Sequence, residues 1–344
     1  MQRALSGLPP PSFAIVMATG IVAVAARQQG WPRLALAFFE FALLAWVLLS
    51  LLSFWRLARH PGQVLDDLRN HQRAPAFFTA VAGTGVLAGG FVALDLNLAA
   101  AVLLGAAALG LWFVMTYGVF GALITSEDKP TLERGIGGAW LLAVVACQSV
   151  SVVAGLLSSH FPQPWRVQLN FVALCSWLFA GMLYTWVIGL IFYRALFFRF
   201  APSDLAPPYW INMGAMAIST LAGAQLVADA PQAPLLLGLL PFLKGFTILY
   251  WATGTWWLPM LVALTLWRYL LRRDRLGGDA LDWSAVFPLG MYSAATFHMA
   301  AAVELPFLQP LAAAFFWIAL LAWGATLVAK AGALRARSRD PAAA

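Results

Sequence analysis

The side chains best able to do chemistry lie in one apolar stretch near the end of the chain, residues 283–303. Tyr292, Ser293 and Thr296 supply hydroxyl groups there, and Pro288 removes a backbone donor, which exposes a carbonyl or bends the helix. Neutral donors of this kind can hold an anion weakly without trapping it. His298 is the one histidine within an apolar stretch, where it could carry a proton or bond to a neighbouring helix as a neutral ring.

Other polar side chains are buried at similar depths in the stretches of small residues. Asn212 lies one turn inside its stretch, where an unpaired amide would be costly. It could donate to an anion or fasten a neighbouring helix, and Thr19 and Thr84 invite the same two interpretations. Ser149 and Ser219 extend this set of candidate pore-lining residues.

Bulky or charged groups stand out against this background. Phe287 and Phe297 could each close a path or pack in a core. Glu40 and Lys244 lie about two turns inside their stretches. Lys244 has a long side chain, so its charged group could reach water at the end of the stretch, or it could attract anions. Glu40 could lie at a contact between subunits, line a vestibule or, like His298, bind and release a proton.

Enzyme motifs are missing from the sequence. We find no paired carboxylates at membrane depth, no His/Cys/Asp cluster, no glycine-rich phosphate loop and no nucleophile elbow. The sequence therefore predicts no catalytic residue, no metal site and no cofactor.

Composition places the chain in a membrane. Hydrophobic residues make up 62% of the 344 residues and charged residues 10%, against roughly 25% charged in soluble domains. A helix needs about 20 apolar residues to cross the hydrocarbon. Ten stretches approach or exceed this length, at residues 12–26, 33–55, 76–94, 98–123, 135–157, 167–193, 209–229, 236–267, 283–303 and 307–330.

The positive charges are distributed unevenly between the connections. Of 21 Lys and Arg residues, 17 fall before the first stretch, after even-numbered stretches or in the tail. The positive-inside rule then places both termini in the cytoplasm, in a multi-pass protein of the bacterial inner membrane. The net charge of +7 thus reflects topology and requires no nucleic-acid partner.

The ten stretches alternate in character. Odd-numbered stretches contain 11 Phe, Trp or Tyr residues and even-numbered ones 29. Small residues also let helices pack tightly in a solid bundle, but five alternating helices are better explained by a shared environment. We predict an all-α membrane protein with five helical hairpins in a quasi-fivefold ring, odd helices lining a central pore and even helices outside. Residues 1–330 form this single domain, followed by a short basic cytoplasmic tail, 331–344.

Four segments resemble the tellurite-resistance/dicarboxylate transporter family, which includes bacterial TehA, plant slow-type anion channels and yeast malate permease. They are Val16–Ile21 (VMATGI), Pro208–Ala215 (PYWINMGA), Lys244–Thr247 (KGFT) followed by Trp251 and Thr255–Trp257 (TWW), and Phe287–Tyr292 (FPLGMY). The resemblance implies ten helices, a homotrimer with one pore per subunit, and anionic cargo such as dicarboxylates or small inorganic anions. It also implies a phenylalanine gate on the ninth helix, matched by Phe287, beside a first-helix glycine, matched by Gly20.

Two mechanisms follow from these observations. The first is a passive anion channel or uniporter for small anions or C4-dicarboxylates through a central pore. The alternative is a proton-linked secondary carrier for dicarboxylate, sulfite or tellurite, in which His298 or Glu40 titrates.

Overall fold

The computed structural model describes residues 8–271 and 283–339, which form helices joined by short connections, without any strand. The expected all-helical class is therefore confirmed. Ten long helices coincide with the ten apolar stretches. They are α2 (Ala14–Gln28), α3 (Pro32–Arg59), α5 (Phe78–Ala93), α6 (Leu98–Thr125), α8 (Leu142–Ser158), α9 (Trp165–Phe197), α10 (Ile211–Asp229), α12 (Leu240–Leu266), α13 (Trp283–Ala302) and α14 (Gln309–Arg339).

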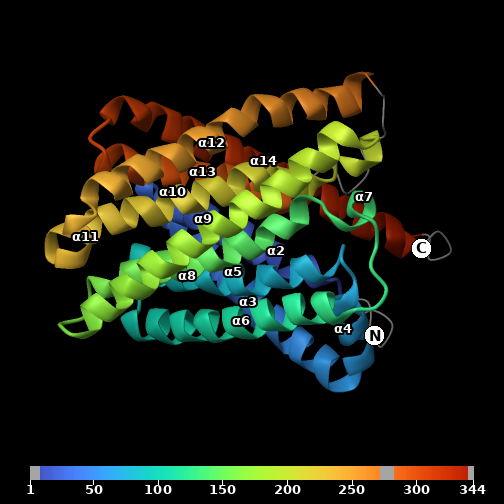
Figure 1. Cartoon of the computed structure of the whole chain (residues 1–344), viewed down its shortest axis with the longest axis horizontal. Coiled ribbons are helices and arrows are strands. Elements are labelled where there is room, and N and C mark those ends of the chain that lie inside the picture. Colours follow the sequence, from blue (N-terminus) through green and yellow to red (C-terminus); the bar gives the residue numbers. More distant parts are fainter. Residues whose placement is uncertain (1–7, 272–282, 340–344) are drawn as a thin grey trace.

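Short elements occupy the ends of the bundle. The long helices lie side by side, with α4 (Pro61–Arg69) and α7 (Leu132–Gly135) at one end and α11 (Pro234–Gly238) at the other (Figure 1). We call these the α4 end and the α11 end. Single turns of 3-10 helix precede several long helices, at Pro10–Phe13, Ala74–Phe77, Gly138–Leu141 and Pro207–Trp210, and others occur in the connections, at Pro202–Asp204, Ala230–Gln232 and Pro306–Leu308. A π-helical turn, Trp267–Leu271, follows α12.

Eight helical segments are long and apolar enough to cross a membrane: those containing α2, α3, α5, α6, α8, α9, α10 and α14. The two other long helices, α12 and α13, carry many Trp, Tyr, Gly and Pro residues, which lower their hydropathy. Helix α14 continues to Arg339, beyond the predicted limit of the last stretch at residue 330.

Burial separates the helices into two groups. Within their apolar windows, 67–89% of the residues are buried in α2, α5, α8 and α10, against 11–44% in α3, α6, α9 and α14. Most of α13 is also buried, whereas α12 buries few of its residues. We call α2, α5, α8, α10 and α13 the inner helices and the other five the outer helices. The small-residue stretches of the sequence are thus the buried ones.

Contacts among the inner helices close on themselves. Helix α2 packs against α5, α5 against α8, α8 against α10, α10 against α13, and α13 against α2. Each outer helix packs against the inner helix that precedes it in the chain: α3 on α2, α6 on α5, α9 on α8, α12 on α10 and α14 on α13. The chain is thus built from five consecutive pairs of helices.

Tryptophans of the outer helices bond to the inner helix of the next pair. In four of the five pairs an indole N–H donates to a hydroxyl or a backbone carbonyl oxygen there. The bonds are Trp46 to Thr84 Oγ1 (2.9 Å), Trp177 to the carbonyl of Ser219 (2.8 Å), Trp251 to Thr296 Oγ1 (3.0 Å) and Trp323 to Thr19 Oγ1 (2.9 Å). Because lipid supplies no partner for a polar group, such bonds fasten one pair to the next.

Two glycines permit close approach between inner helices. A Cβ on Gly214 would lie 2.8 Å from Cγ of Pro288, so the missing side chain on α10 accommodates the proline ring of α13. A Cβ on Gly20 would lie 2.6 Å from Cγ1 of Val86. Gly20 therefore lies at the contact between α2 and α5.

The tryptophan bonds predict measurable coupling between helix pairs. Thr19→Val and Trp323→Phe should each lower the free energy of unfolding in mixed micelles by about 1 kcal/mol, with a coupling energy of about 0.6 kcal/mol in the double variant. Trp317→Phe, on the same helix as Trp323 but partly exposed and engaged in ring packing, serves as the control. Strictly additive effects of the two single changes would show that the bond between Trp323 and Thr19 does not stabilise the fold.

Candidate functional site

A cavity of about 200 Å³ lies between the five inner helices. Its wall residues follow one another at the three-, four- and seven-residue spacings of a helix face. They are Ile21, Val24, Arg27 and Gln28 of α2, Gly85, Val86, Gly89 and Ala93 of α5, Ser149, Val152 and Leu156 of α8, Ile218, Leu221 and Gln225 of α10, and Met291 and His298 of α13. All five pairs of helices therefore contribute to one enclosed space.

Polar groups of this cavity concentrate at the α11 end, where the inner helices finish. Arg27, which is exposed, marks the mouth together with Gln28, Gln225 and His298. Deeper in, the wall is aliphatic, and Ser149 supplies the one hydroxyl side chain. The site is thus a polar mouth above an apolar shaft.

His298 connects the shaft to a side pocket. Its Nε2 lies 2.9 Å from Nε2 of Gln28, across the gap between α13 and α2. His298 also lines a second pocket of about 350 Å³ between α10, α12 and α13, which includes Lys244. Two of the three candidate proton or charge sites of the sequence, His298 and Lys244, therefore border the same region of the mouth.

The charged groups at this end lie opposite one another. Arg27 is 3.3 Å from Asp95, and Lys244 is 3.5 Å from Glu304. All four side chains are at least one-third exposed, so each pair contributes little to stability while placing a carboxylate beside each of these two cations.

A buried carboxylate stands behind the mouth. Asp229 accepts hydrogen bonds from Ser158 Oγ (3.2 Å) and Gln225 Nε2 (3.0 Å), and Arg166 is close enough to act on it electrostatically. The bond to Asp229 holds the side chain of Gln225, which lines the cavity. Asp229 bonds to a wall residue without itself lining the cavity.

The shaft closes toward the α4 end. Phe287, Met17 and Val145 lie one helical turn beyond the wall residues Met291, Ile21 and Ser149, on the same helix faces. Their exposed fractions are 1%, 1% and 0%, so their side chains leave no room for water at this level. Phe287 is the largest of these side chains.

Several predicted pore residues make contacts between helices and do not line this cavity. Thr19, Thr84 and Thr296 accept the tryptophan bonds described above. Ser293 donates to the carbonyl of Ala312 on α14. Their role in holding an anion stays a prediction.

The other polar candidates of the inner helices are also buried among helices. The Tyr292 hydroxyl lies 2.8 Å from that of Thr255 on α12. Ser219 accepts from Gln148 Nε2 (2.9 Å). Asn212 is fully buried, and its amide has no hydrogen-bond partner among the described residues. Of the predicted pore-lining residues, Ser149 lines the shaft.

The remaining candidates lie away from the shaft wall. Phe297 is one residue before His298, so its side chain leaves α13 on a different face, and its ring packs 5.7 Å from the His298 ring. Glu40 is exposed on α3, and Gly20 faces Val86. A gating role for Gly20 or Phe297 stays a prediction.

Sequence reasoning missed three of the four residues that form the mouth, His298 being the exception. Arg27, Gln28 and Gln225 lie at the ends of their apolar stretches and resemble ordinary flanking residues. The available signal was spacing, because Gln28 follows Ile21 by seven residues and Gln225 follows Ile218 by seven, which places each pair on one helix face. In the described part of the chain, no group of three or more His, Cys, Asp or Glu side chains could hold a metal ion.

Comparison with known proteins agrees with this architecture. The voltage-dependent anion channel family matches residues 7–331. The chain belongs to that family. An uncharacterized transporter of Methanocaldococcus jannaschii is 23% identical over 95% of both chains, and a second from that organism is 23% identical over 93% of this chain and 91% of its own. An uncharacterized membrane protein of Mycobacterium tuberculosis is 42% identical over 43% of this chain and 74% of its own.

Family membership confirms the resemblance found in the sequence and supports anion transport in general terms. It places the chain among channels and transporters. The apolar helices and the membrane-protein relatives together make it a multi-pass membrane protein.

The closed shaft predicts a pattern of cysteine reactivity. In a background with Cys147 and Cys175 replaced by alanine, Val24→Cys and Leu221→Cys should react with a small, membrane-impermeant thiosulfonate. Met17→Cys, two helical turns from Val24 toward the α4 end and on the same face of α2, should be protected. Labelling is read by mass spectrometry of protein in sealed vesicles. Equal labelling of Met17→Cys would show that the shaft is open below Ile21.

Proposed function

We propose that this protein is a passive anion channel or uniporter of the bacterial inner membrane, with a pore through each subunit. Ten membrane-spanning helices form five hairpins in a ring, and the inner helices enclose the path. The observation that carries the proposal is the cavity between all five inner helices, with the buried Phe287 one helical turn from its wall residue Met291.

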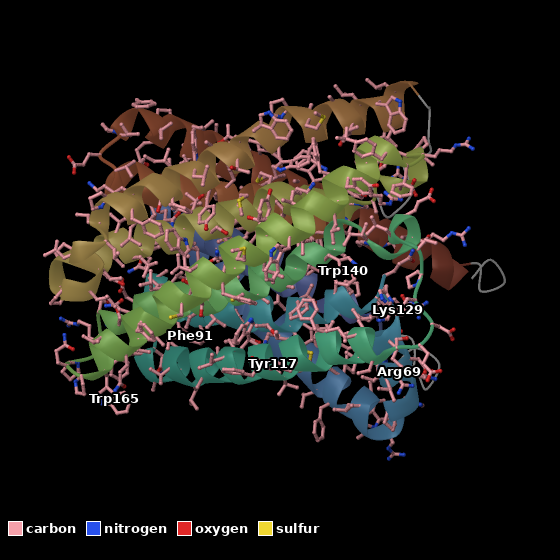
Figure 2. All side chains as sticks on the ribbon, in the orientation of Figure 1. Arg69, Phe91, Tyr117, Lys129, Trp140 and Trp165 are labelled. Carbon is pink, nitrogen blue, oxygen red and sulfur yellow. The ribbon has the colours of Figure 1, made fainter. Side chains whose placement is uncertain are left out.

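The orientation follows from the charges. Arg69 and Lys129 lie at the α4 end and Trp165 at the opposite end (Figure 2). Since Lys and Arg concentrate in the connections at the α4 end, the positive-inside rule favours this end, with both termini, as cytoplasmic. The polar mouth then faces the periplasm. Aromatic outer helices contact lipid and, in the homotrimer that the family resemblance implies, neighbouring subunits.

Phe287 is the gate in this proposal. It lies on the same face of α13 as Met291 and His298 and is buried where the shaft ends. An anion arriving from the mouth would meet its ring, together with Met17, before reaching the cytoplasmic half. Neutral walls suit a channel because they hold an anion too weakly to trap it.

Reconstitution in liposomes tests the gate. Phe287→Ala should increase chloride and nitrate flux by at least about tenfold, the effect of lowering a barrier by about 1.4 kcal/mol. Phe316→Ala, a change of the same size at a buried phenylalanine of α14 that does not line the cavity, should leave flux near the wild-type level. The measurement is anion efflux under a potassium–valinomycin potential. Flux through Phe287→Ala no greater than wild type would reject the gate.

The proton-linked carrier is the second candidate, favoured by the position of His298 in the cavity wall beside Gln28. It predicts that anion uptake acidifies the liposome interior and that His298→Gln abolishes this coupling while binding persists. The channel predicts charge movement without protons, measured with an internal pH dye and a potential-sensitive dye together. Acidification tied to uptake would replace the channel by the carrier.

A further inference from the structure

We propose that the pathway selects small monoanions with an apolar body over dianions such as C4-dicarboxylates. The proposal rests on the proposed function and concerns the same cavity. It identifies the cargo class, which the sequence leaves open between dicarboxylates and small inorganic anions.

The wall of the shaft favours an apolar cargo. Below the mouth, the wall is built from aliphatic side chains of α2, α5, α8 and α10, among them Val24, Val152, Leu156 and Leu221. A methyl or methylene group placed against them leaves water and gains about 0.8 kcal/mol. A second charged group in the same place would lose its water and find the single hydroxyl of Ser149.

The mouth cannot compensate two negative charges. Arg27 and Lys244, the cations that line the two pockets, already face the carboxylates of Asp95 and Glu304. Asp229 adds a buried carboxylate behind Gln225. Because each charged group loses its own water, a cargo with two separate anionic groups faces at least about twice the desolvation penalty of a monoanion.

The arrangement also orients the cargo. Gln28, Gln225 and His298 offer neutral hydrogen-bonding groups at the mouth, which suit one anionic head. The shaft below extends from this level to Met291 and Ser149, where an apolar tail can lie. A monoanion with head outward and tail inward satisfies both parts of the cavity, and a dicarboxylate satisfies only one.

Alkanesulfonates test this selection because they stay fully ionised and do not cross lipid as neutral acids. In liposomes containing Phe287→Ala protein, methane-, ethane- and propanesulfonate are compared with ethane-1,2-disulfonate and chloride. The apparent KM should fall by up to about fourfold for each added methylene, and disulfonate flux should be at least about tenfold below that of propanesulfonate.

Matched variants locate the effect in the shaft. Val152→Thr places a hydroxyl in the wall and should reduce the gain per methylene by at least half. Val153→Thr, directed toward α6 beside Gly105, should leave that gain unchanged. A KM independent of tail length, disulfonate flux equal to propanesulfonate flux, or equal effects of the two variants would each overturn the proposal. Failure to carry chloride as well would instead reject the proposed function.

Discussion

Polar groups within the helical bundle depend on partners inside the protein, because the hydrocarbon offers none. The inner helices carry many hydroxyls, and the outer helices carry the tryptophans that satisfy several of them. A threonine that accepts an indole bond from an outer helix points away from the central axis. The same interaction that joins the helix pairs therefore removes polar groups from the shaft, which leaves its wall aliphatic.

The fold was largely predictable because it depends on local properties of the chain. Apolar length sets where a helix can span the membrane, and the contrast in aromatic content between 12–26, with one aromatic residue, and 33–55, with six, matches the contrast in burial between α2 and α3. Residues 331–339 were assigned to a tail because they are polar. The structure continues α14 through them, since a helix that has left the membrane no longer needs apolar residues. Hydropathy cannot detect that continuation.

The site was less predictable because composition does not fix the rotation of a helix about its axis. In α2 small residues occur on every face, so Thr19 was as reasonable a wall residue as Ile21. The partner that turns Thr19 outward is Trp323, which is more than 300 positions away in the sequence. Ser149 and His298 do line the cavity, and spacing along α13 puts Phe287 and His298 on the face of Met291, while the gating role of Phe287 stays a prediction.

Opening of the shaft depends on how the side chains at its closed end, Phe287 and Met17, can move. Phe287 and Met17 are buried on all sides, so neither ring nor thioether can leave the axis unless neighbouring atoms yield. Methionine adapts easily, because its chain is unbranched. Pro288, directly after Phe287, removes a hydrogen bond from the ladder of α13, and its ring already occupies the space left by Gly214. A bend of α13 at this point would displace Phe287. The bond from Trp251 to Thr296, two turns away, would keep the C-terminal half of α13 in place. The sequence thus combines a bulky Phe287 with a following proline that interrupts the hydrogen-bond ladder of α13.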